Sequence, residues 1–363
     1  MGSYVNSNRL ISPGELKNLE HIDLSMCRKL KSLPDSFGRL KNLRHIDLSC
    51  AFELESLPDS FGELQNLQRL VLRYCRKLQI FPETLGKISS LECLDLRHCP
   101  KIEVWPPQVS HNRSLLKLFL SGTNLKELPS AIGELSNLQV LHLGSQLKRL
   151  PDNIGDLRSL QELKLSGCTQ LKHLPDSIRL LTQLGELKVK NSGLEYLPPC
   201  LVELNSLQRL EIEECPLSKL PLRKVEGGIV LNKVDASIVN CMFGLKYLRL
   251  CRTNISGLSF GEGLCPNLQH LSILSCGFLS EVVELPATLI ELELSECCTL
   301  RKIGLCGLER LEKFQLVECH TVEELPGLET LVRLKELKVN CHYLKRIDGL
   351  AQLTELQVLN TEK

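Results

Sequence analysis

One pattern of leucines recurs along nearly the whole chain and constrains the fold more than any other feature. Its cleanest copy begins at Leu160 and reads LxxLxLxxCxxLxxLPxxIxxL, and the next copy begins 24 residues later at Leu184. One short unit cannot bury its own apolar side, so such units must stack on one another. The pattern therefore predicts a solenoid of many repeats, although 363 residues would otherwise suggest two or three globular domains.

Each part of the repeat predicts one structural element. Leu163–Leu165 alternates apolar and polar residues with period two, which predicts a short strand with one buried face. Pro175 cannot donate a ladder hydrogen bond and biases the residue before it towards an extended backbone. Ile178, Leu181 and Leu184 are three apart, which suits 3₁₀ structure. We expect an α/β fold, a right-handed solenoid or horseshoe with a parallel sheet on its concave face and short 3₁₀ or extended segments on its convex face.

The repeats fall into two arrays. In residues 19–221 the copies follow one another every 22 to 24 residues, and most carry a Leu-Pro equivalent. In residues 245–363 the spacing is 21 to 23 residues, and few of the earlier prolines have a counterpart. Residues 1–18 form a ragged entry, and residues 222–244 contain no complete unit. We interpret residues 222–244 as an irregular junction between the arrays, and a binding loop is the alternative.

The cysteines indicate the cellular compartment. The chain has 17 of them, and eight occupy one fixed place in the repeat: Cys27, Cys75, Cys99, Cys168, Cys215, Cys276, Cys297 and Cys319. Equivalent side chains on stacked units run parallel to one another, so we interpret these residues as small, buried and reduced. Reduced cysteines favour a cytoplasmic or nuclear protein. No apolar run approaches the roughly 20 residues that a membrane span requires, so we predict no span.

Neither charge nor motif indicates a nucleic-acid, cofactor, metal or catalytic site. The net charge is +1 and the pI about 7.5, which gives no reason to expect a nucleic-acid partner. The neighbours His98 and Cys99 point in diverging directions, whereas a catalytic dyad must converge. His45 and Cys93 lie two repeats apart, about 9–10 Å, and zinc lies only about 2.0–2.3 Å from each ligand. We therefore expect a non-enzymatic chain without a cofactor.

Function is expected on the inner face of the sheet, where the residues between the fixed leucines project. Arginine and tyrosine are over-represented among binding hot spots, and exposed apolar groups suggest contact surface. The predicted partner-binding residues of the first array are Arg44, His45, Arg69, Arg73, Tyr74, Arg97, His98 and Phe119. Those of the second array are Tyr247, Arg249 and Arg252. The alternative is a solvated strand face without a partner. Because Leu70 belongs to the core and Arg73 to the face, we expect Leu70→Asp to destabilise the array and Arg73→Glu to leave its melting unchanged.

Two segments carry a family resemblance, LKSLPDSFGRLKNLRHIDLS (Leu30–Ser49) and LKELPSAIGELSNLQVLHLG (Leu125–Gly144). With the fixed cysteine of the repeat, Leu-Pro and a Phe-Gly or Ile-Gly pair, the repeats resemble the C-terminal leucine-rich-repeat domains of plant nucleotide-binding leucine-rich-repeat disease-resistance proteins. The resemblance covers residues 16–363. It implies a protein-binding recognition or autoinhibitory domain of an intracellular immune receptor. The partner it implies is a pathogen effector, a host protein or the nucleotide-binding domain of the same receptor.

A second group also resembles this chain. The proline-containing repeats are similar to plant intracellular Ras-group leucine-rich-repeat proteins, which would make the chain a free-standing scaffold. In that group asparagine usually takes the place of the fixed cysteine, so the cysteines favour the receptor. Gly86-Lys87 lacks the earlier glycine and the following Ser or Thr of a phosphate-binding loop, so the sequence contains no nucleotide cradle of its own.

Overall fold

The computed structural model describes residues 16, 18–144, 146–220, 242–261 and 264–361. The chain divides into two compact units, Met1–Cys168 and Thr169–Lys363. The predicted entry (residues 1–18) and the predicted junction (residues 222–244) lie almost wholly outside the described residues. Both therefore stay predictions.

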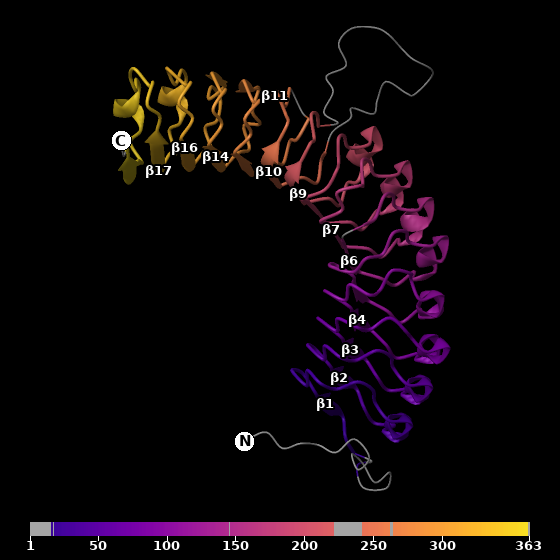
Figure 1. The fold of residues 1–363 in the computed structure, drawn as a ribbon. Helices are drawn as coiled ribbons and strands as arrows, with labels where there is room; N and C mark the ends of the chain where they lie inside the picture. The colour runs from indigo at the N-terminus through magenta and orange to yellow at the C-terminus, as the bar shows by residue number, and fades with distance from the viewer. Residues whose placement is uncertain (1–15, 17, 145, 221–241, 262–263, 362–363) are drawn as a thin grey trace, which may run out of the picture. The chain divides into compact units, whose positions relative to one another are not determined.

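In the first unit each repeat contributes one strand and one short 3₁₀ helix, on opposite sides of the repeat (Figure 1). The strands are β1 (His21–Asp23), β2 (His45–Asp47), β3 (Arg69–Val71), β4 (Cys93–Asp95), β5 (Lys117–Phe119), β6 (Val140–Gly144) and β7 (Glu162–Ser166). The 3₁₀ helices are η1 (Asp35–Arg39), η2 (Asp59–Glu63), η3 (Glu83–Lys87), η4 (Pro107–His111), η5 (Ser130–Glu134) and η6 (Asp152–Asp156). Neighbouring strands pair in parallel with equivalent repeat positions opposite each other, as Leu70 opposite Leu94 illustrates.

The second unit also contains a parallel sheet, but part of the side opposite that sheet is built differently. Its main strands are β8 (Glu186–Lys190), β9 (Arg209–Cys215), β10 (Tyr247–Thr253), β12 (His270–Leu274), β14 (Glu291–Ser295), β16 (Lys313–Val317), β17 (Glu336–Asn340) and β18 (Val358–Asn360). Its 3₁₀ helices are η7 (Asp176–Leu180), η8 (Pro199–Glu203), η9 (Leu328–Thr330) and η10 (Leu350–Gln352). Three extended segments, β11 (Gly257–Ser259), β13 (Glu281–Val283) and β15 (Lys302–Ile303), form a second sheet. The predicted fold class is confirmed, and this second sheet is an addition that the repeat pattern did not predict.

The Leu-Pro and Phe-Gly pairs explain how the 3₁₀ helices form. Pro58 precedes η2 with an extended backbone, φ −72° and ψ 153°. Its carbonyl accepts the N–H of Phe61 at 3.0 Å, and the N–H of Leu64 then bonds to the Phe61 carbonyl at 3.0 Å. A Cβ on Gly62 would lie 2.3 Å from the Cβ of Thr84 in the next repeat. Glycine is required there because neighbouring 3₁₀ helices approach this closely.

The fixed leucines form the core, as their spacing predicts. Leu67, Leu70 and Leu72 are fully buried, and each such burial is worth roughly 1.5–3 kcal/mol. Seven of the eight repeat cysteines are buried, and those the structure describes are free thiols. They also form hydrogen bonds, and the Cys99 thiol lies 2.9 Å from the carbonyl of Leu72. Cys27 is exposed, contrary to prediction, because no earlier repeat among the described residues packs against it.

Candidate protein-interaction surface

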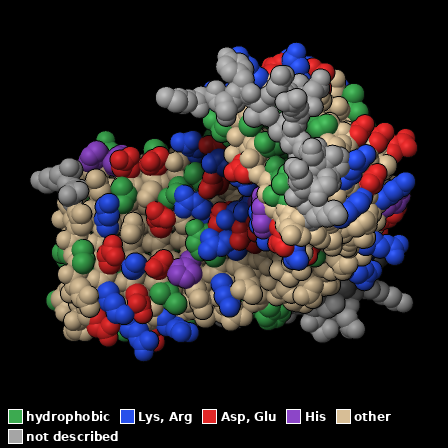
Figure 2. All heavy atoms as spheres, turned by 90° about the horizontal axis from the view of Figure 1, so that it is seen from below, with side chains coloured by type: hydrophobic (Ala, Val, Ile, Leu, Met, Phe, Trp, Pro, Cys, Tyr) green, Lys and Arg blue, Asp and Glu red, His purple; other side chains and the backbone are tan. Residues whose placement is uncertain are grey.

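The sheet face of the first unit gathers most of the predicted binding residues. Equivalent positions of neighbouring repeats form rows across the strands, so Arg69 lies between His45 and Cys93, and Val71 lies between Asp47 and Asp95. Figure 2 shows acidic and basic side chains interspersed over the visible surface. Charges of both signs also lie in these rows, Arg69 in the first and Asp47 and Asp95 in the second.

Asp95 is a buried anchor that the sequence analysis missed. Its side chain is 2% exposed, and it accepts hydrogen bonds from Arg73 Nε at 2.6 Å and from Arg97 at 2.6 Å and 2.9 Å. Burial alone would raise the pKa of this carboxyl, but the hydrogen bonds from Arg97 and Arg73 outweigh it and lower the pKa below its usual value. The recurrence of aspartate at the same repeat position, in Asp23 and Asp47, was the available signal.

This anchor changes the expectation for Arg73. The sequence placed Arg73 on the sheet face with no structural role, so that Arg73→Glu would leave melting unchanged. In the structure its guanidinium bonds to a buried carboxylate. A glutamate in its place would face Asp95 across the same short distance, so we now expect Arg73→Glu to destabilise the unit.

Aromatic contacts bring together the other predicted residues of the first unit. The guanidinium of Arg97 lies 4.8 Å from the ring centroid of Phe119, and Phe119 meets the ring of His142 edge-on at 4.7 Å. Tyr74 and His98 stack with centroids 4.5 Å apart and an interplanar angle of 7°. Both have left-handed backbones, with φ of 58° and 59°, in the loops that follow β3 and β4. Tyr74 and His98 thus stand at the rim of the sheet, beside the Arg97–Phe119 contact.

The remaining cations of this face are less engaged. Arg44 Nε lies 3.7 Å from a carboxylate oxygen of Glu20, and both side chains are about half exposed. Burial lowers the pKa of His45, and the positive charge of Arg69 lowers it further. Arg69 and Lys117 are exposed, and neither has a carboxylate within ion-pair distance among the described residues. Their donors are therefore available to a partner.

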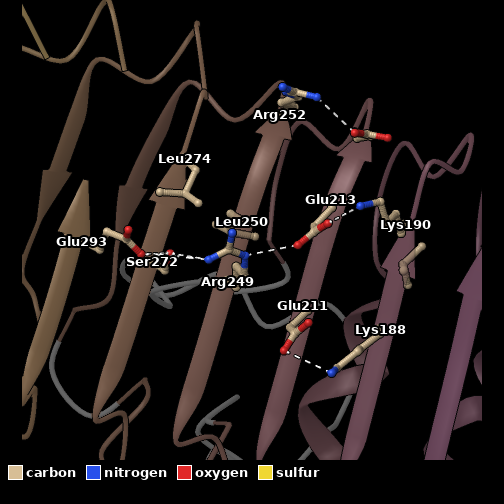
Figure 3. Close-up of polar contacts among 12 residues, drawn as sticks. Lys188, Lys190, Glu211, Glu213, Arg249, Leu250, Arg252, Ser272, Leu274 and Glu293 are labelled. Carbon is tan, nitrogen blue, oxygen red and sulfur yellow. Dashed lines mark hydrogen bonds and ion pairs between the residues drawn. The ribbon is translucent and has the colours of Figure 1, made fainter. Parts of the chain in front are cut away.

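In the second unit the predicted binding residues bond to charged and hydroxyl side chains on neighbouring strands (Figure 3). Arg249 donates to Glu213 at 3.2 Å and to the hydroxyl of Ser272 at 3.1 Å, and that hydroxyl donates to Glu293 at 2.6 Å. Lys190 approaches the other oxygen of Glu213 at 3.0 Å. These contacts form one chain of charge and hydroxyl groups across the face, from β8 to β14.

The two other predicted residues of this unit are also engaged. Arg252 pairs with Glu214 at 3.1 Å, and the guanidinium of Arg209 lies 3.9 Å from the ring centroid of Tyr247. Acidic and basic side chains of this unit thus pair with each other across neighbouring strands. Within the part of the chain that the structure describes, no three potential metal ligands gather, and no helix is long and apolar enough to cross a membrane.

Comparison with known families supports the repeat assignment. Residues 18–40 match the family described as Leucine Rich Repeat, and residues 87–174 match the leucine-rich repeats described as disease resistance protein RPS4B-like. Both matched segments are therefore leucine-rich repeats. The longer match supports the predicted resemblance to the repeat domains of plant nucleotide-binding disease-resistance proteins. Neither matching description names an enzyme.

Solved structures share the leucine-rich-repeat fold. A leucine-rich-repeat protein of Leptospira interrogans is 23% identical, with 96% of each chain covered and a TM-score of 0.57. Internalin InlF of Listeria monocytogenes is 16% identical, with 96% of this chain and 88% of that chain covered and a TM-score of 0.53. At such identities the likeness concerns the fold alone. Comparison with curated proteins gives no match.

Proposed function

We propose that this leucine-rich-repeat chain is a non-catalytic protein-binding domain and the recognition or autoinhibitory portion of a plant intracellular immune receptor. The match of residues 87–174 to disease-resistance repeats carries the proposal. That segment includes β4 to β7 and therefore Asp95, Arg97 and Phe119 of the candidate surface. The free cysteines support a cytoplasmic or nuclear location. A Ras-group scaffold, the second candidate, is not favoured by the family match or by the cysteines.

The binding site in this proposal is the sheet face of the first unit. Arg69 and Lys117 are exposed there without a carboxylate within ion-pair distance among the described residues. Tyr74, at the rim of the same sheet, is 42% exposed. Arginine and tyrosine give much of the binding energy in protein interfaces. The partner would be a pathogen effector, a host protein or the receptor's own nucleotide-binding domain, and the switch would lie in a domain other than these repeats.

Capture from plant cells tests the proposal. The tagged chain would be expressed in leaf tissue with and without infection, and captured proteins would be identified by mass spectrometry. The surface variant replaces Arg69, Tyr74 and Phe119. Its matched control replaces three exposed residues on the 3₁₀ side of the same unit: Arg39, Lys87 and Glu134. The melting temperature of each variant is measured first, because Phe119 is only half exposed.

The expected result is capture of an effector or a nucleotide-binding protein by the wild type and the control, with loss of capture in the surface variant. Equal capture by all three chains would contradict the assigned surface. Capture of a constant set of proteins unrelated to defence, with no nucleotide-binding protein among them, would favour the scaffold.

A further inference from the structure

A second set of positions, at the rim of the first sheet, is unusual in composition. In most of the described repeats the residue directly before the fixed cysteine position has a left-handed backbone. In the second unit this position is mostly polar or charged: Asn191, Glu214, Arg252, Ser275, Glu296 and Glu318. In the first unit it carries Met26, Cys50, Tyr74 and His98, followed by glycine at 122 and 167. Met26 is 54% exposed and Tyr74 is 42% exposed, so large apolar groups stand in solvent here.

The left-handed backbone at these positions makes a bulky side chain energetically costly. Glycine adopts a positive φ without steric penalty, as Gly122 does at φ 80°. A bulky residue such as Tyr74, at φ 58°, is strained in the same conformation. The fold accepts glycine at this position, so the repeat does not itself require a tyrosine or methionine there.

The residue directly after the fixed cysteine position forms a second rim feature. The ring of Phe52 lies between two guanidinium groups from the repeats on either side, with Arg28 Cζ at 5.5 Å and Arg76 Cζ at 4.5 Å from its centroid. A guanidinium stacked on a ring keeps its N–H donors directed outward in its own plane. Both arginines are exposed, and among the described residues neither has a carboxylate within ion-pair distance. Phe52 therefore holds two unsatisfied donor groups in place.

Charge along the same loops is in positive excess. The cations are Arg28, Lys29, Lys31, Arg76, Lys77 and Lys101, and the anions are Glu53, Glu55 and Glu103. Lys77 already pairs with Glu53 at 2.6 Å. The unpaired charge of the rim is therefore mainly positive, and a complementary partner is acidic.

We propose that this rim patch, defined as Met26, Arg28, Phe52, Tyr74, Arg76 and His98, binds an acidic segment of a partner protein. The proposal rests on the protein-binding function above and specifies the chemistry of the partner. Arg28 and Arg76 are two repeats apart, about 10 Å in a parallel sheet, so they take two separate carboxylates. Met26 and the Tyr74–His98 stack receive an aromatic or aliphatic side chain of the same segment. Methionine, tyrosine and arginine are the side chains enriched in protein interfaces.

A peptide selection tests the rim patch without a known partner. Random peptides displayed on phage are selected on the purified 363-residue chain, and the enriched peptides are synthesised and measured by fluorescence anisotropy. We expect sequences with two or more acidic residues and one aromatic or leucine. Arg28→Glu with Arg76→Glu should weaken their binding at least tenfold. The matched control, Lys126→Glu with Arg149→Glu, reverses two exposed cations of the same unit away from the patch and should leave binding unchanged.

Tyr74→Gly separates binding from folding. Glycine relieves the left-handed strain at position 74, so the variant should melt no lower than the wild type. It should nevertheless bind the acidic peptides more weakly, because the aromatic surface is gone. Unchanged affinity in this variant would remove Tyr74 from the patch.

Several outcomes overturn the proposal. They are enrichment of neutral or basic peptides, absence of any enriched sequence, acidic binders whose affinity the Arg28/Arg76 variant does not weaken, and equal binding of duplex DNA.

The test also separates this inference from the proposed function. Acidic binders that depend on the rim, with no immune partner captured from leaf, would retain the rim patch and refute the receptor role. The reverse result would refute the rim patch alone.

Discussion

The sheet faces of the two units differ in how their charges are satisfied. In the first, Arg69 and Lys117 are exposed without a carboxylate within ion-pair distance among the described residues. In the second, Arg249 contacts Glu213 and Ser272 within one connected chain of polar groups. The leucine cores are alike, so the core does not determine which unit recognises a partner. A partner on the second face must disrupt bonds that already exist, whereas a partner on the first face adds new ones.

The largest expected effect tests the claim that the cores are alike. Leu70 in the first unit and Leu248 in the second are both essentially unexposed. An aspartate at either position would bury an unpaired charge. The loss of unfolding free energy should exceed the roughly 4–5 kcal/mol that marks exceptional destabilisation. Urea denaturation followed by circular dichroism should show loss of the cooperative transition of the mutated unit in both variants. Loss in only one would mean that the two cores are not equivalent.

Asp95→Asn should have the next largest effect on stability. It removes the charge that holds Arg73 and Arg97, and we expect a loss of about 2–4 kcal/mol because a buried ion pair is broken on one side. Asp47→Asn is the matched control. Asp47 occupies the same row, and among the described residues its side chain accepts a hydrogen bond from the Ser49 N–H alone, at 2.8 Å, so about 1 kcal/mol or less should be lost. Equal losses at the two positions would show that the arginines do not stabilise the unit.

The same carboxyl gives a pH prediction. The folded-state pKa of Asp95 lies below its ordinary 3.8, so its contribution is complete above that value and is lost as pH falls through the folded pKa. The stability difference between wild type and Asp95→Asn should be constant from about pH 5 to 8 and shrink below about pH 4. Chemical denaturation across this range measures it. A difference that grows as the pH falls would have the wrong sign for a carboxylate stabilised in its charged form.

The sequence predicted the repeating parts well and the side-chain pairing poorly. Periodic leucines determine the strands, and Leu-Pro with Phe-Gly determines the 3₁₀ helices, because each follows from local geometry repeated many times. The pairing of Arg73 with Asp95 joins residues 22 positions apart, and exposed cations in a sequence do not reveal which of them is bonded. For the same reason Phe52 and Arg28 were not predicted as a contact. The sheet of β11, β13 and β15 was missed because those repeats have no proline at the place where Leu-Pro stands in the first array.

Arg249→Ala probes the second face with a smaller effect. Glu213 would keep Lys190 at 3.0 Å, and Ser272 would keep Glu293 at 2.6 Å, so no carboxylate is left without a partner. We expect a loss of about 1–2 kcal/mol, less than for Asp95→Asn. Urea denaturation in low and high salt measures it, and the loss should decrease with salt. A loss as large as that of Asp95→Asn would show that this chain of contacts is not redundant.

The smallest effect on stability is expected for a substitution of Arg69. The pKa of the neighbouring His45 imidazole reports the substitution more sensitively. Arg69→Glu alters an exposed side chain, so the free energy of unfolding should change by no more than about 0.5 kcal/mol. Burial lowers the pKa of His45 first and the charge of Arg69 second. Reversing that charge favours the imidazolium, so the His45 pKa should rise when it is followed by NMR titration of the ring proton. Arg252→Glu, in the second unit, should leave it unchanged. If the His45 pKa stayed constant in Arg69→Glu, then the Arg69 charge would not act on its neighbour in the row. The contrast between the two sheet faces, which depends on unpaired cations in the first unit, would then lose one of its two residues.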